Sequence, residues 1–339
     1  MKTRKKVIYI YAAFIILSLI LTKEAYGEDR KYHGSEITHN LISEQTLRRQ
    51  IDFLCDTICE GRRTGTRGST EAVFWISRRF RQLGLKPMAE DTYIRHFRTE
   101  RGVLGRNVIG CLPGSKNGTR PNYILIAAHY DGIGILGDRL YPGADNNASG
   151  VVAMLGVAEM LKAMTRFGKV YGRNIIFAAI DAKETNLNGS KALWEQIKEG
   201  RLKDPDTGKT ITKDMISFMV NIEQIGSSLS PLKSGREDYM IMLNGNNDYM
   251  GSALTSVNSR YDIGLDLSFD YYGSSDFTGI FYRKISDQRV FIENGMPAVM
   301  FTSGITMNNN KTYDKPETLN MTVLKKRIWL IFHWVEKMI

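Results

Sequence analysis

The stretch YILIAAHYDG, residues 123–132, decides the fold class of this chain. Its first six residues form a nearly continuous apolar run, which is typical of a strand buried on both faces of a sheet. The run ends in His129, Tyr130 and Asp131. Polar side chains at the carboxyl end of such a strand lie where α/β sheets place their sites. We therefore expect a functional site at this end of the sheet.

Similar apolar runs alternate with helical patterns along the rest of the chain. Further strands are predicted at residues 103–111, 174–180, 216–222 and 298–302, and helices at residues 42–59, 69–83, 148–163, 187–198 and 320–339. This alternation predicts an α/β fold whose sheet is covered by helices on both faces. Because no linker-like stretch interrupts it, residues 45–339 are predicted to form a single domain after an extension at residues 28–44.

The N-terminus has the three parts of a secretory signal peptide. Basic residues at positions 2–6 precede an apolar run at 7–21, and Ala25-Tyr26-Gly27 offers small residues for cleavage. The alternative is an uncleaved membrane anchor, although the run is short for a full span. We expect residues 1–27 to be removed, leaving an exported protein, periplasmic or extracellular, without a stable membrane anchor.

The charge of the chain gives no sign of a nucleic-acid partner. The formal net charge of the whole sequence is +10, and loss of the five basic and one acidic residues within 1–27 lowers it to +6. The remaining basic residues are scattered, and no nucleic-acid-binding motif is present.

Two motifs suggest metal chemistry, and each also has a purely structural interpretation. In H-x-D, His129 could bind a metal through one ring nitrogen while Asp131 orients the ring through the other, but a lone histidine before a turn is often structural. In GADNNASG, residues 143–150, Asp145 could present its two oxygens to two cations, or it could belong to a turn that caps a helix.

Further acids follow other predicted strands. Glu184 comes after residues 174–180 and Glu223 after residues 216–222, and Asp314 lies nearer the C-terminus. If these carboxylates meet Asp145, four negative charges share a small space and need neutralising partners. Metal ions, or one ion together with a lysine, would supply them.

These motifs together resemble the dizinc aminopeptidases, a group that is also kin to the glutaminyl cyclases. The resemblance covers about residues 45–338. It is carried by EGRRTGTRG (60–68), NVIGCLPGS (107–115), AAHYDG (127–132), GADNNASG (143–150), LNGS (187–190), NIEQIG (221–226) and NGMPA (294–298). It implies a mixed, largely parallel sheet sandwiched by helices, and a peptide or an N-terminal amino acid as substrate.

The resemblance also assigns roles to individual positions. It implies metal ligands at His129, Asp145 (bridging), Glu184, Glu223 and Asp314, with Asp131 orienting His129 and Lys183 at the position of the general base. Three of these depart from the family pattern: Lys183 replaces a glutamate, Glu223 is one methylene longer than the usual aspartate, and Asp314 stands where a histidine is expected.

These departures predict an impaired or non-standard site. A protonated lysine cannot accept the proton of a metal-bound water. We expect one or two zinc ions held weakly, another divalent cation such as magnesium, calcium or manganese at the all-oxygen half of the site, or no metal. The implied function is that of an exported metallo-aminopeptidase-like protein, with another acid such as Asp181 or Asp131 as base. The alternative is an inactive relative that binds peptide or a protein partner through the same cleft.

Overall fold

The computed structural model describes residues 39–88, 92–114, 123–244 and 247–339. The predicted signal peptide and most of the predicted extension lie outside these ranges. The chain divides into two units at Leu41, and the fold concerns the unit Ile42–Ile339.

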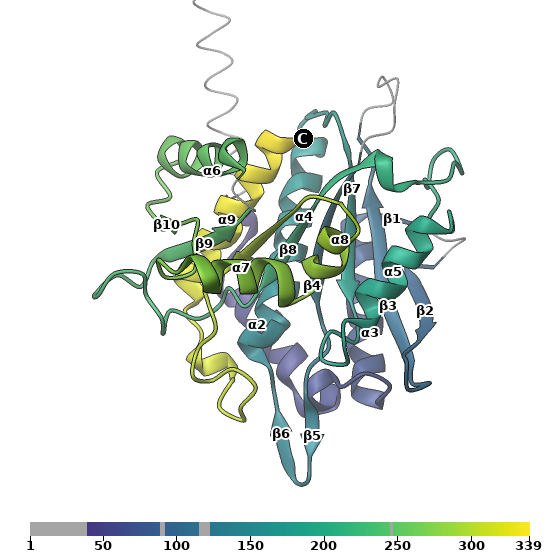
Figure 1. The fold of residues 1–339 in the computed structure, drawn as a ribbon, viewed down its shortest axis with the longest axis horizontal. Helices are drawn as coiled ribbons and strands as arrows, with labels where there is room; N and C mark the ends of the chain where they lie inside the picture. The colour runs from purple at the N-terminus through teal and green to yellow at the C-terminus, as the bar shows by residue number, and fades with distance from the viewer. Residues whose placement is uncertain (1–38, 89–91, 115–122, 245–246) are drawn as a thin grey trace, which may run out of the picture. The chain divides into compact units, whose positions relative to one another are not determined.

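A nine-stranded sheet forms the centre of this unit (Figure 1). Its strands, in spatial order, are β1 (Lys86–Pro87), β3 (Leu104–Leu112), β7 (Asn174–Ile180), β4 (Tyr123–His129), β8 (Ile216–Glu223), β11 (Ala298–Thr302), β9 (Tyr239–Leu243) and β10 (Asp266–Ser268), while β2 (Ile94–Arg98) also pairs with β3. The four central strands from β7 to β11 are mutually parallel, and β3 and β9 pair with them antiparallel. The predicted mixed, largely parallel sheet is thus confirmed.

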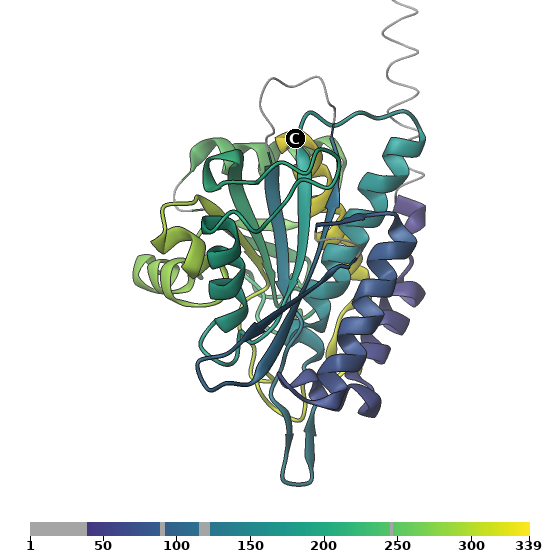
Figure 2. The same cartoon turned by 90° about the vertical axis from the view of Figure 1, so that its right-hand side faces the viewer.

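Helices cover both faces of the sheet, as Figure 2 shows from the side. They are α2 (Glu44–Cys55), α3 (Arg67–Leu83), α4 (Gly150–Arg166), α5 (Asn188–Lys198), α6 (Asp248–Arg260), α7 (Ser275–Lys284), α8 (Gln288–Glu293) and α9 (Met321–Met338). Buried side chains of α2, α3, α4, α6 and α9 share one apolar core, and those of α5 and α8 share a second.

Burial on both faces explains why strand β4 is apolar from its first residue up to His129. All seven of its residues are buried. Ile124, Ile126 and Ala128 pack into the core that contains α4 and α9, whereas the residues between them pack into the core that contains α5 and α8. Because successive side chains of a strand point to opposite faces, a strand covered on both sides must be apolar at every position.

The first predicted helix is shorter than its sequence pattern suggests. Helix α2 ends at Cys55 because Asp56 adopts an extended conformation, and its carboxylate accepts a hydrogen bond from the backbone N–H of Ile58. A separate 3₁₀ turn, Thr57–Arg62, follows. An aspartate that caps a new turn thus ends the helix, although the apolar spacing continues past it.

Among the described residues, the segment Ala144–Arg166 is long and apolar enough to cross a membrane. In this fold, 78% of its apolar window is buried. Helix α4, which forms most of it, packs against β4 and α9. A helix that is apolar on every side suits the centre of a large core in this way.

A hairpin of β5 (Gly134–Leu136) and β6 (Arg139–Tyr141) projects from the body of the fold. It follows the H-x-D turn directly and leads into the GADNNASG loop. The hairpin therefore connects the two loops that carry His129 and Asp145.

Candidate functional site

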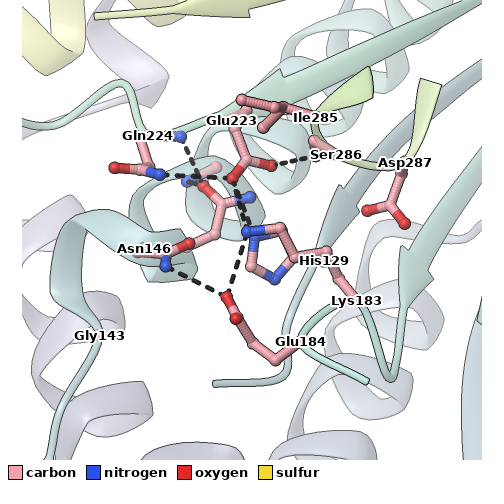
Figure 3. A network of polar contacts seen from close by, with 12 residues as sticks. His129, Gly143, Asn146, Lys183, Glu184, Glu223, Gln224, Ile285, Ser286 and Asp287 are labelled. Atoms are coloured by element: carbon pink, nitrogen blue, oxygen red, sulfur yellow. Dashed lines mark hydrogen bonds and ion pairs between the residues drawn. The ribbon is translucent and has the colours of Figure 1, made fainter. Parts of the chain in front are cut away.

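The candidate site lies where three neighbouring parallel strands end (Figure 3). His129 is the last residue of β4, Glu223 is the last residue of β8, and Lys183 and Glu184 follow β7. Strand β4 pairs with both β7 and β8 in parallel. Their carboxyl ends therefore meet at one edge, which brings together residues that are far apart in the sequence.

The buried carboxylate of Glu223 contacts several polar side chains at this edge of the sheet. Its Oε1 lies 3.2 Å from His129 Nε2 and 3.3 Å from Lys183 Nζ, and its Oε2 accepts a 2.5 Å hydrogen bond from Ser286 Oγ. Only 2% of its surface is exposed. Burial opposes its ionisation, but the positive charges of Lys183 and His129 hold the pKa of Glu223 well below its usual range.

Lys183 points into the acidic cluster. Its Nζ lies 3.1 Å from Glu184 Oε1 as well as 3.3 Å from Glu223 Oε1, and its side chain is 13% exposed. Burial lowers the pKa of Lys183, but the two glutamates outweigh burial and raise it above its ordinary value. The Lys183 side chain is therefore an ammonium group at neutral pH.

The ring of His129 is held from its other side by the main chain of Asp131. His129 Nδ1 lies 3.1 Å from the Asp131 carbonyl oxygen and 3.5 Å from the carboxylate. Burial lowers the pKa of His129, but the charge of Glu223 and the hydrogen bonds to Asp131 and Glu223 together outweigh burial and raise it to about 10. The imidazole is thus a second positive charge beside Glu223.

The carboxylate of Asp131 is hydrogen-bonded to the backbone of the loop that follows β7. Its two oxygens accept the backbone N–H groups of Lys183 and Glu184, each at 3.0 Å. This carboxylate sets the position of Lys183, while the carbonyl group of the same residue sets the position of the histidine.

Asp181, the other candidate for an alternative base, is also hydrogen-bonded on both oxygens. Its Oδ1 accepts hydrogen bonds from Thr64 Oγ1 and from the backbone N–H of Ala182, and its Oδ2 accepts one from the backbone N–H of Arg106. Burial, and then the charge of Asp131, raise the pKa of Asp181 to about 6. Both Asp131 and Asp181 are completely buried, so neither carboxylate is exposed to take up a proton from a substrate.

Asp145 keeps one oxygen without a partner. Its Oδ1 accepts hydrogen bonds from the Gly226 N–H at 2.7 Å and from Ser149 Oγ at 3.1 Å. Its Oδ2 is buried and has no hydrogen-bond partner in the described part of the chain. Burial, and then the nearby Asp314, raise the pKa of Asp145 to about 7. An orphaned carboxylate oxygen in this position is suited to a cation or a donor group.

The carboxylate of Asp314 is turned toward the backbone of the Asp145 loop. Its two oxygens accept the N–H groups of Asp145 at 2.7 Å and of Asn146 at 3.0 Å, and its carbonyl oxygen accepts the N–H of Ala144. Asp314 has 1% of its surface exposed, and its hydrogen bonds hold the backbone of the Asp145 loop in place. Both of its carboxylate oxygens are occupied by the backbone.

Sequence reasoning missed one residue that organises the site, Arg62. Its buried guanidinium donates hydrogen bonds to four carbonyl oxygens, those of Leu54, Tyr130, Pro142 and Gly143. It thus ties the H-x-D turn to the loop before Asp145. The only signal in the sequence was its position in the glycine-rich EGRRTGTRG stretch, which identifies a special loop but assigns no role to the arginine.

The donor set fits a pair of zinc ions poorly. The ammonium of Lys183 lies between Glu184 and Glu223, where a cation would have to approach them. The oxygens of Asp314 are taken by backbone N–H groups. Across residues 39–88, 92–114, 123–244 and 247–339, no three His, Cys, Asp or Glu side chains form a group arranged to hold a metal. The unpaired Oδ2 of Asp145 is a feature that favours a cation.

Solved structures share this fold at low sequence identity. A zinc aminopeptidase from Bacillus subtilis has a TM-score of 0.63 and 14% identity, and the similarity covers 87% of this chain and 95% of that one. A glutaminyl cyclase from Porphyromonas gingivalis has a TM-score of 0.61 and 14% identity, with 87% and 97% covered. These likenesses establish the fold alone.

Sequence similarity extends over the part of the chain that carries the site. Aminopeptidase YwaD of Bacillus subtilis is 29% identical over 172 residues, which is 50% of this chain and 32% of that protein. The chain thus spans about a third of the length of this curated relative. Residues 107–335, more than half of the chain, match peptidase family M28. With the fold, the order of the motifs and this match in agreement, the chain belongs to peptidase family M28.

Proposed function

We propose that this protein is an aminopeptidase-like member of its family that binds peptides but is impaired in metal-dependent hydrolysis. The observation that carries the proposal is the Lys183 ammonium, 3.1 Å from Glu184 and 3.3 Å from Glu223. The ammonium group of Lys183 lies between these two glutamates, where a metal ion would have to bind them.

The chemistry of hydrolysis supports the same conclusion. In a metal-dependent peptidase, a metal-bound water attacks the peptide bond and a carboxylate takes up its proton. A cation with a raised pKa cannot take up that proton, and loss of a general base alone lowers the rate by ~10²–10⁴-fold. The complete burial of Asp131 and Asp181 argues against a substitute base nearby.

Two acceptors support the binding of a free α-amine, the group that marks the N-terminus of a peptide. Glu184 has a side chain that is 19% exposed, so solvent and ligands can reach it. The orphaned Oδ2 of Asp145 is a second acceptor. An α-ammonium group would supply the missing donors, and its charge would be balanced by these carboxylates.

A second candidate function is slow hydrolysis with one weakly held divalent cation. The free oxygen of Asp145 is the observation that favours it, because a cation would satisfy this oxygen as well as an ammonium group would. A single ion would leave the contact between Lys183 and Glu223 in place.

Turnover and binding assays on purified protein separate these functions. We expect no turnover of aminoacyl-nitroanilides with added zinc, cobalt or manganese, but saturable binding of peptides with a free N-terminus and not of their N-acetylated forms, measured by calorimetry. Lys183→Glu, which restores a base, should gain metal-dependent turnover, while Lys191→Glu on the surface of α5 should not. Metal-dependent turnover by the parent protein that is abolished by Asp145→Ala would refute the proposal and support the second candidate.

We also propose that the protein is exported, on the basis of the signal-peptide pattern in residues 1–27. N-terminal sequencing of the mature protein from the periplasm or the medium tests this. We expect it to begin just after Gly27, whereas recovery of an intact N-terminus in the membrane fraction would support the anchor alternative.

A further inference from the structure

We propose that the outer edge of β2 is a docking site for an extended acidic peptide segment, which adds to the sheet as a further strand. The site would be separate from the cluster around Glu223, because β3 and β7 lie between β2 and β4 in the sheet. The proposal therefore does not depend on the proposed function.

The backbone of β2 offers hydrogen-bonding groups on its outer side. Within the described strands, β2 pairs with β3 alone. The Tyr93 carbonyl accepts from the Ile109 N–H, and the Thr99 N–H donates to the Val103 carbonyl, so odd-numbered residues face β3. Because these groups alternate along an antiparallel strand, the N–H and C=O groups of His96 and Arg98 point outward.

A hollow lies beside this edge on each face of the sheet. On the α3 face, a hollow of about 510 Å³ lies between the helix and the start of β2. On the α5 face, a second hollow of about 420 Å³ is lined by β2 and by residues in and just after α5. Since the side chains of a strand alternate between the two faces, an added strand would place every second side chain beside each hollow.

The charge around the edge selects an acidic segment. Arg78 and Arg81 line the α3-face hollow, are exposed, and form no ion pair with any acid among the described residues. Phe74, which is 59% exposed, lines the same hollow. His96 and Arg98 add basic side chains on the edge itself.

The hollow on the α5 face is also lined by basic side chains. Arg201 pairs with Glu199 at 2.5 Å, whereas Lys203 Nζ donates a hydrogen bond to the neutral hydroxyl of Thr210, which leaves the lysine charge in place. The hollows on both faces therefore favour an acidic segment, and we expect its acidic side chains above all at the alternate positions that point toward Arg78 and Arg81. Charged edge strands also protect sheets from aggregation, and that role alone predicts no ligand.

The test uses the full chain and a fluorescent eight-residue peptide of alternating glutamate and threonine, with binding followed by anisotropy. We expect saturable binding that is weakened about tenfold or more by the double variant Arg78→Glu/Arg81→Glu, because complementary charge becomes repulsive. The matched control Arg260→Glu/Lys284→Glu, which makes the same charge change on exposed positions of α6 and α7, should leave binding unchanged. Thermal unfolding verifies that both double variants are folded.

Two further measurements separate strand addition from simple charge attraction. A peptide N-methylated at alternate residues on the bonding side cannot donate to the edge and should lose binding, and amide hydrogen exchange at His96 and Arg98 should slow when the parent peptide binds. The proposal fails if the peptide does not bind. It also fails if the N-methylated peptide or a sulfated polysaccharide binds as tightly at the same arginines, or if the protected amides lie elsewhere.

Discussion

Replacing Lys183 with methionine tests whether the built-in ammonium group holds the site together. The change keeps most of the side-chain volume but leaves the Glu223 carboxylate, with 2% of its surface exposed, without its lysine partner. Breaking a buried ion pair costs ~3–5 kcal/mol. Because His129 remains 3.2 Å from the same oxygen, we expect the low end of that range, about 3 kcal/mol of unfolding free energy. At roughly 2 °C per kcal/mol for a chain of this size, the Tm should fall by about 6 °C.

The loss of unfolding free energy in Lys183→Met should depend on pH, and this dependence would identify Glu223 as its source. The native pKa of Glu223 is below its unfolded value, so its contribution to stability is present above about pH 4 and is lost as the pH falls through the native pKa. Without Lys183 the native pKa rises, because a favourable charge has gone. The variant should therefore be most destabilised relative to the parent above about pH 4, and the difference in unfolding free energy should narrow as the pH falls below 4 toward the native pKa of the parent.

Urea unfolding of both proteins at several pH values measures this gap. The matched control is Lys191→Met, because Lys191 pairs with Glu100 at 2.7 Å but both side chains are exposed. Removing that surface pair should cost less than about 1 kcal/mol. The reasoning would be refuted if Lys183→Met cost no more than the control, or if its cost did not change with pH.

Three other substitutions test two supports of the site, Arg62 and Asp314, and Asp287, a buried acid near His129 (Figure 3). Arg62→Lys keeps the charge but cannot reach four carbonyl groups, so urea unfolding should report a loss of about 3 kcal/mol or more, and a near-neutral result would remove its organising role. Asp314→Asn takes one acceptor from the N–H groups of Asp145 and Asn146, and we expect a loss of about 1–3 kcal/mol and a lower Tm; an unchanged Tm would contradict the contact. Burial raises the pKa of Asp287 to about 7, so the native state keeps a proton that the unfolded chain releases between about pH 4 and 7, and stability falls as the pH rises through that window. Asp287→Asn should flatten this slope in urea unfolding at pH 5 and pH 8, and an equally steep slope would exclude Asp287 as its cause.

The central strands could be predicted from the sequence because both of their faces pack against an apolar core, which makes their sequences continuously apolar. Strands β4 and β7 have the bounds that their apolar runs predict, since residues 123–128 of β4 pack into one core or the other. Strand β2 was missed because an edge strand carries basic residues and shows no apolar run. The end of α2 was missed because it depends on the conformation of one residue, Asp56, and not on hydrophobic spacing.

The candidate site was predictable in its location but not in the direction of each carboxylate. Strand ends in a parallel sheet meet at one edge, so the proximity of His129, Lys183 and Glu223 followed from the topology. The partners of Asp131 and Asp314 did not follow, because their oxygens accept backbone N–H groups from loops that only the folded chain brings near. Sequence spacing contains no information about which N–H groups a buried carboxylate will face.

The departures that the family resemblance implies at Lys183, Glu223 and Asp314 are consistent with one another in charge. Four buried or half-buried acids cannot share this edge without compensation. Lys183 and His129 supply two positive charges beside Glu223 and Glu184, and the longer Glu223 has an oxygen within 3.3 Å of both cations. Asp314 is compensated by N–H groups of the backbone. Asp145, with a pKa raised to about 7, accepts hydrogen bonds on Oδ1 from Gly226 and Ser149, but its Oδ2 has no partner in the described part of the chain. A ligand that carries a positive charge should therefore bind at Asp145, and Lys183→Glu should bring back a need for metal ions through the whole cluster.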